Sequence, residues 1–234
     1  MHAVAAVKSR FVGFPRPAFE LLAQLAENNN RAWFAAHRPA LEALVVRPAL
    51  DLVVDLGPLL RRQVSQAIRA EPRVGGSILR LRHDARYARE DPFRTHVELW
   101  FWEGRGPSHQ HPGFFVRLTA DRLVLGAGIT SFPAGMLERY RAAVDEPHAG
   151  RNLAGIVHRL ERGGWAVEGH WRRRVPAPYP PNHERADLLR RTGLRVARAE
   201  RLPEAVHGPG LAPLIASGLA RVSQFHRWLA EIDE

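Results

Sequence analysis

The fold is decided by the stretch from His96 to Ala127, which reads HVELWFWEGRGPSHQHPGFFVRLTADRLVLGA. It contains apolar runs of strand length at 96–102, 113–118 and 122–127. Only residues 119–121 separate the last two runs, a length that suits a β-hairpin. Residues 99–102 are apolar on both faces, which favours a central strand and places Trp100 and Trp102 in the core.

Helical patterns surround this stretch. From about residue 15 to residue 70, apolar side chains recur at helical spacing. Pro39 and Pro48 should break this pattern into segments. After Gly75-Gly76 the period changes, and alternation predicts a strand at 78–82. Beyond residue 132 helical patterns return, with strand candidates at 165–174 and 194–201 and a final helix at about 211–229.

Strands in the middle of the chain and helices towards its ends indicate an α+β fold. We expect a central, mostly antiparallel sheet covered by N-terminal and C-terminal helices. No internal repeat or long linker divides the sequence, so residues 1–234 are predicted to form a single domain. Its parts would be helical (about 15–70), sheet-rich (about 75–130) and mixed (about 132–234).

Composition narrows the possible functions. The chain has no cysteine, which excludes disulfides, thiolate catalysis and cysteine-based zinc sites. No apolar run approaches the roughly 20 residues that a membrane span requires. The N-terminal residues lack the features of a signal peptide, so a cytoplasmic location is expected.

The formal net charge of +10 attracts anions such as nucleic acids and nucleotides. All the basic residues except Lys8 are arginine, and most lie near an acidic residue, a pattern that a GC-rich coding bias would also produce. Arg172-Arg173-Arg174 beside Trp171 could grip a phosphate backbone, with the indole as a stacking surface, or could be a solvated strand end.

The most unusual local sequence is RLRHDARY at 80–87. In an extended chain, alternate side chains share a face, which would place Arg80, Arg82, Asp84 and Arg86 together. Such guanidiniums suit a bound phosphate or carboxylate, because an arginine fork pairs with either through two hydrogen bonds. The alternative is an exposed ladder of ion pairs, each worth less than about 1 kcal/mol.

This stretch resembles the signature of the bacterial and fungal proteins known as domain of unknown function 2461. Arg80, Asp84, Arg86 and Tyr87 match R-x-x-R-D-x-R-F. Residues 93–96 match an aromatic residue followed by K-T-H, with arginine at position 94 in place of lysine. His83 replaces the second signature arginine, and a lysine of the signature is missing near residues 90–92.

The resemblance extends along most of the chain. Trp33 and Arg174 fall on other segments of the family pattern, so they join Arg80, Arg82, Arg86 and Arg94 as expected ligand-binding residues. Asp84, as general base, and His96 are the catalytic candidates. If the missing lysine is catalytic in relatives, this chain would bind the same ligand without turning it over.

Two hypotheses follow: a small-molecule site or enzyme for an anionic ligand, and a basic nucleic-acid-binding or interaction module without catalysis. No cofactor is expected, and no sequence feature indicates an oligomeric state. His109-x-His111, with His83 or His96, is a weak metal motif, because no supporting zinc-site spacing accompanies it. We therefore predict no metal site and no membrane association.

Overall fold

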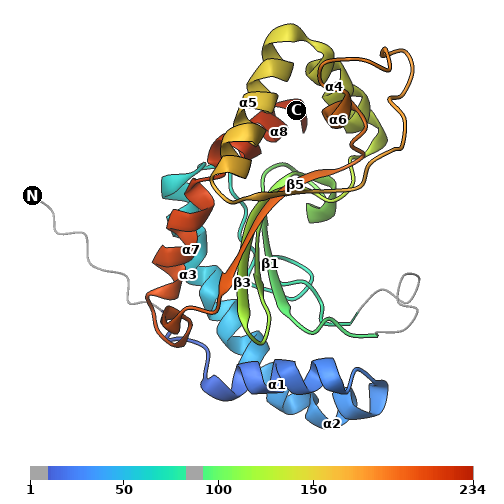
Figure 1. Ribbon diagram of the computed structural model, residues 1–234. Coiled ribbons are helices and arrows are strands. Elements are labelled where there is room, and N and C mark those ends of the chain that lie inside the picture. The colour runs from blue at the N-terminus through green and yellow to red at the C-terminus, as the bar shows by residue number, and fades with distance from the viewer. Residues whose placement is uncertain (1–9, 83–91, 234) are drawn as a thin grey trace, which may run out of the picture.

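The computed structural model describes residues 10–82 and 92–233, and Figure 1 shows its arrangement. The His83, Asp84, Arg86 and Tyr87 positions of the signature lie outside the described residues.

The N-terminal part is helical, as predicted. It comprises α1 (Arg16–Glu27), α2 (Arg31–Leu41), a π-helical stretch (Glu42–Val46) and α3 (Arg47–Gln63). The expected breaks at the prolines do not occur, because helical structure continues without interruption from Arg31 to Gln63. Pro39 is accommodated inside α2. Pro48 falls in the first turn of α3, just after the wider π turn, where a residue without a backbone N–H is tolerated.

The sheet has five strands in the order β1-β2-β3-β5-β4, and every neighbouring pair is antiparallel. The strands are β1 (Val97–Trp102), β2 (Gly113–Leu118), β3 (Arg122–Ile129), β4 (Ala166–Glu168) and β5 (Leu194–Arg201). The α+β class and the antiparallel sheet predicted from the sequence are confirmed. Phe115 faces Gly126 across the β2–β3 ladder, and a Cβ at Gly126 would lie 2.2 Å from the Phe115 ring, so only glycine fits there.

The expectation of a central position for residues 97–102 was wrong, since β1 is an edge strand of this sheet. Residues 69–82 run along its outer side through isolated bridges, such as Ile78 to Leu99, instead of a regular strand. Backbone hydrogen bonds from Leu79 N to Glu98 O (3.0 Å) and from Trp100 N to Ser77 O (2.8 Å) pair polar groups on the outer edge of β1. Strand β1 is therefore buried on both faces without being central.

The C-terminal half contains α4 (Ala134–Asp145), α5 (Pro147–Arg162), α6 (Ala186–Leu189), α7 (Leu211–Ala220) and α8 (Ser223–Asp233). The single helix expected at 211–229 is divided at residues 221–222, and the strand expected at 165–174 is only β4. Short 3-10 turns occupy Ser108–Gln110 and Glu204–His207.

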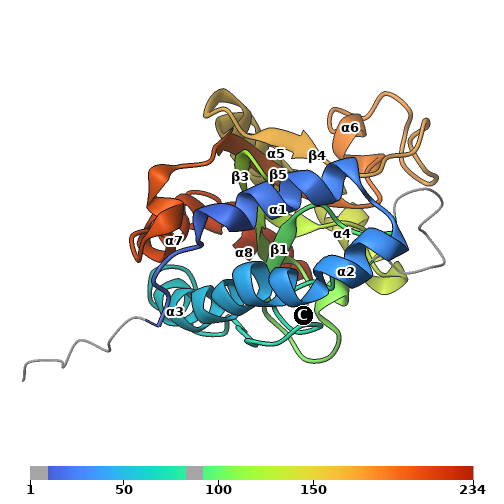
Figure 2. The same ribbon diagram turned by 90° about the horizontal axis from the view of Figure 1, so that it is seen from below.

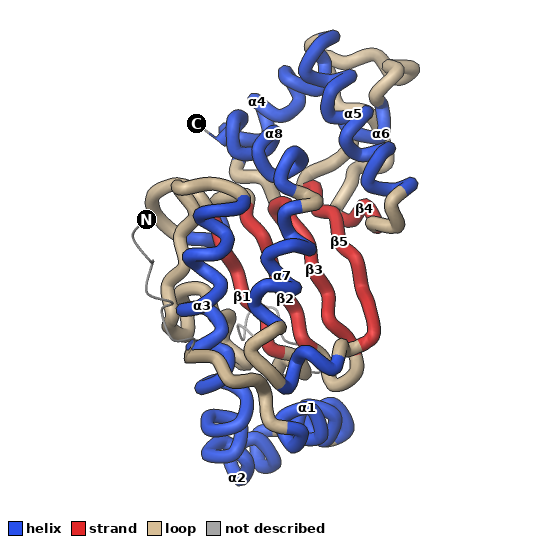
Figure 3. Tube along the Cα trace, turned by 90° about the vertical axis from the view of Figure 1, so that its left-hand side faces the viewer, coloured by secondary structure: helices blue, strands red, loops and turns tan. Residues whose placement is uncertain are grey.

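Helices α3 and α7 lie across one face of the sheet (Figure 3). The main hydrophobic core fills this layer and includes residues from Phe11 to Leu229. Helices α1 and α2 lie side by side near one end of the sheet, and α4, α5 and α6 lie near the other (Figures 1 and 2). The opposite sheet face carries a smaller cluster of Trp100, Trp102, Phe115 and Ala197.

Candidate functional site

A cleft of about 490 Å³ lies between α2 and the segment that precedes β1; we call it the basic cleft. It is lined by the signature residue Arg80 and by Arg82, which is the other described arginine of the stretch at 80–87. The lining residues are Arg31, Phe34, Ala35, Arg38, Leu41, Glu42, Val46, Val74, Ile78, Leu79, Arg80, Leu81, Arg82, Phe93 and Val97.

Helix α2 provides one wall because of its residue spacing. Arg31, Phe34 and Arg38 recur at intervals of three and four and so share a helix face. The helix is capped by Asn30, whose side-chain oxygen accepts a hydrogen bond from Trp33 N at 2.9 Å. This N-cap fixes where the helix starts and therefore which face it turns towards the cleft.

Phe93 forms part of the floor and is held from two sides. Its N–H donates to Asn29 Oδ1 at 3.1 Å, and its carbonyl accepts from Asn29 Nδ2 at 2.8 Å. Its ring stacks on Phe34 with centroids 3.8 Å apart and planes 2° from parallel. The turn between α1 and α2 is thereby joined to the chain just ahead of β1.

The rim of the cleft is strongly basic. Four arginines line it, at positions 31, 38, 80 and 82, against one carboxylate, Glu42. Within residues 10–82 and 92–233, none of these arginines forms an ion pair with a carboxylate. Unpaired guanidiniums of one sign in a single cleft repel one another, which an anion between them would relieve.

The structure brings Arg80 and Arg82 together in this cleft. Arg94 lies beside them and donates from Nη1 to the Arg80 carbonyl at 2.7 Å, so it braces the wall backbone. Trp33 stacks on His37, with centroids 3.9 Å apart, and is not one of the lining residues. Arg174 is exposed in the loop between β4 and α6, away from the cleft. Asp84 and Arg86 lie outside the described residues.

His96 belongs to a different cluster. Its Nε2 lies 3.2 Å from Glu98 Oε2, and Arg117 approaches the same oxygen with Nε at 3.0 Å and Nη2 at 2.9 Å. Val97 lines the cleft, and the next residue of a strand points to the opposite face, so Glu98 and its partners lie on the far side of the sheet.

The environment of Glu98 shifts its titration strongly. Burial is the largest effect and raises the pKa, but the hydrogen bond from His96 and the positive charges of Arg117, His96 and Arg195 together lower the pKa to about 2. Glu98 is only 7% exposed, yet its low pKa keeps the carboxylate charged inside the protein at neutral pH. The described contacts give the cluster a stabilising role and account for the orientation of His96.

Sequence reasoning missed Arg31 and Arg38. Their spacing around Phe34 on a predicted helix was visible, but nothing in the sequence indicated that this face of α2 lies opposite residues 78–82. The missed Glu98 had a clearer signal, since it is a lone acid in an otherwise apolar strand.

The two histidines of the weak metal motif have different surroundings. His111 binds the Asp233 carboxylate through Nδ1 and the Arg105 carbonyl through Nε2, whereas His109 is exposed. Among the described residues, no group of three or more metal-ligating side chains comes together.

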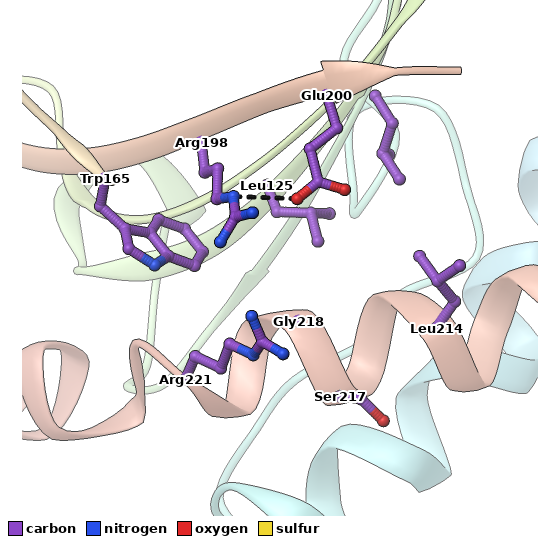
Figure 4. Close-up of a pocket in the computed structure, with 9 residues that line it drawn as sticks. Leu125, Trp165, Arg198, Glu200, Leu214, Ser217, Gly218 and Arg221 are labelled. Carbon is purple, nitrogen blue, oxygen red and sulfur yellow. Dashed lines mark ion pairs between the residues drawn. The ribbon is translucent and has the colours of Figure 1, made fainter. Parts of the chain in front are cut away.

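A second hollow, of about 240 Å³, lies between α7 and strands β3 and β5 (Figure 4). Arg198 and Arg221 extend into it beside Trp165, and Leu214 also lines it. Arg198 is already paired with Glu200 at 2.9 Å, so this hollow has a weaker excess of positive charge than the basic cleft. It is also about half the size, and the basic cleft is therefore the stronger candidate.

Comparison with known proteins supports the family resemblance of the sequence. No helix within the described ranges has the length and apolarity to cross a membrane. No curated protein matches the chain. A family model described as "Conserved hypothetical protein (DUF2461)" matches residues 17–228. The chain therefore belongs to the DUF2461 family.

Proposed function

We propose that the protein binds a small molecule that carries a phosphate or carboxylate group and an apolar part, and that the basic cleft is the binding site. The observation that carries this proposal is the set of four arginines, which have no carboxylate partner among the described residues, above a floor of Phe34, Ile78 and Phe93. Arginine recognises oxyanions through paired hydrogen bonds, and an apolar floor stabilises a ring or alkyl chain by burying it.

The dimensions support a small ligand. Ligand pockets in proteins usually span about 300–1,000 Å³, and the cleft of about 490 Å³ falls within that range. Its floor is held in place by the Asn29 hydrogen bonds and the stacked phenylalanine rings, so little ordering of the floor is required when a ligand binds.

Asp84, which lies outside the described residues, is the proposed base for any turnover at this site. We propose that Asp84→Asn preserves anion binding, since the shape of the side chain is kept, and removes any turnover that requires a base. His96 is proposed to act only by way of Glu98, because its ring is committed to that carboxylate.

A thermal-shift titration tests the binding proposal. Phenyl phosphate, inorganic phosphate, nucleotides and sugar phosphates are added to wild type and to a variant with Arg38→Gln and Arg82→Gln. Both side chains are exposed, so the variant should fold. Arg62→Gln, which removes an exposed charge at the end of α3, is the control.

Phenyl phosphate should stabilise wild type and the control, and more strongly than inorganic phosphate does, because only the former reaches the apolar floor. Each lost charged hydrogen bond weakens binding by on the order of tenfold or more, so the double variant should respond only at far higher concentrations. Equal responses of wild type and the double variant to every probe would refute the site.

A further inference from the structure

Trp171 presents an indole to solvent on a hydrogen-bonded backbone at the opposite end of the sheet from the basic cleft. The residue is 62% exposed, although a tryptophan ring normally contributes to a core. It forms an antiparallel bridge with Arg191, and Arg172 N donates to the Arg190 carbonyl at 2.7 Å. The ring is therefore held at the surface by paired backbone and is not on a free loop tip.

Arginines surround this ring. The guanidinium carbons of Arg190 and Arg191 lie 5.2 and 5.4 Å from its centroid, within the range of cation–π attraction. Arg190 also pairs with Asp187. No comparable carboxylate partner accompanies Arg191 or Arg172 in the described part of the chain, so the positive charge around Trp171 is largely uncompensated.

Arg141 adds a further guanidinium from α4. Burial and then the nearby charge of Arg172 lower the pKa of Arg141, which shows that like charges crowd together here. Nε and Nη2 of Arg141, and Nε of both Arg190 and Arg191, are buried without a hydrogen-bond partner among residues 10–82 and 92–233. Buried donors are normally paired, so this crowding of guanidiniums favours an acceptor, which would contact the exposed parts of the same side chains because these particular nitrogens are buried.

The chemistry of that acceptor follows from the surface. Phosphate oxygens accept from arginine N–H groups, and a nucleobase can stack on an exposed indole. The bases of a duplex are already stacked on one another and cannot reach the ring, whereas those of a single strand can. The exposed Arg172, Arg173 and Arg174 continue the positive charge along the chain from Trp171, which suits a ligand with several phosphates.

We propose that Trp171 with Arg141, Arg172, Arg190 and Arg191 binds single-stranded nucleic acid. The arginines hold the phosphates, and one base stacks on the indole. This surface is separate from the basic cleft and would serve a second activity of the protein.

Fluorescence anisotropy with labelled 20-nucleotide dT and rU strands tests the proposal, at low salt and over a salt series. Trp171→Ala should weaken binding by about tenfold or more, and Trp171→Phe should retain much of the affinity, since a base stacks on either ring. Because Trp171 is mostly exposed, both variants should fold, which circular dichroism checks. The two strands show whether DNA or RNA is preferred.

The charge contribution is tested with two exposed side chains. Arg172→Gln with Arg174→Gln should reduce the slope of log affinity against log salt by about 1.4, which corresponds to two lost phosphate contacts on a single strand. The control is Arg62→Gln with Arg201→Gln, which removes the same charge from exposed positions elsewhere. Wild-type affinity in Trp171→Ala, or an equal loss in the pair and its control, would overturn the proposal. Binding of inorganic polyphosphate as tight as that of dT and rU would do the same.

Discussion

Glu98→Gln is expected to destabilise the protein by about 3 kcal/mol at pH 7. The folded-state pKa of Glu98 is about 2, against an ordinary value of 4.5. Each pKa unit corresponds to about 1.4 kcal/mol of preference for the charged form, which gives the figure of about 3 kcal/mol. Glutamine keeps the shape of the side chain but cannot supply the negative charge that Arg117 and His96 contact.

The pH dependence has a definite sign. Because the folded-state pKa is lowered, the stabilisation is fully present above the unfolded-state pKa near 4.5 and is lost as the pH falls towards 2. At pH 3 about 2 kcal/mol of it has gone, so the difference between wild type and Glu98→Gln should shrink to about 1 kcal/mol.

Urea unfolding followed by circular dichroism at pH 7, 4 and 3 measures this difference. Glu20→Gln, an exposed change on α1, should alter stability by no more than about 0.5 kcal/mol at any pH. The reasoning is refuted if Glu98→Gln is as stable as wild type at pH 7, or if the difference between them is the same at pH 7 and pH 3.

Three further predictions concern the scaffold. Arg185 is 7% exposed and donates to carbonyls at the end of α4 at 2.6 and 3.0 Å. Arg185→Met should therefore lower the free energy of unfolding, measured by thermal unfolding, by about 2–4 kcal/mol. A loss no larger than that of the exposed Arg173→Met would contradict this. Gly126→Ala should destabilise by at least about 2 kcal/mol, because its Cβ would overlap a neighbouring ring and carbonyl, whereas Gly208→Ala, with open space around it, should be nearly neutral. Chelator treatment should leave the melting temperature unchanged, and a drop restored by zinc would revive the histidine metal site.

Local periodicity was sufficient to predict the layers of the fold. Apolar runs of strand length identified β2 and β3, a strand candidate at 194–201 identified β5, and recurrence every three to four positions identified α1 and the C-terminal helices. These signals depend only on neighbours along the chain. They were weaker where a segment is buried on all sides, which is why β1 was placed in the centre of the sheet although it is an edge strand.

The sequence by itself also determined the family and the basic character of residues 80–94, because both are read from residue types at fixed spacing. Only the tertiary structure decided which side chains lie opposite those residues. Asn29 binds the backbone of Phe93 across 64 positions of the chain, and this contact places Arg31 and Arg38 of α2 opposite Arg80 and Arg82. The same holds for Trp171, whose ring meets Arg190 and Arg191 only because the two segments pair as extended backbone. Such contacts form when distant apolar surfaces bury one another, and no local pattern in the sequence encodes which surfaces will meet.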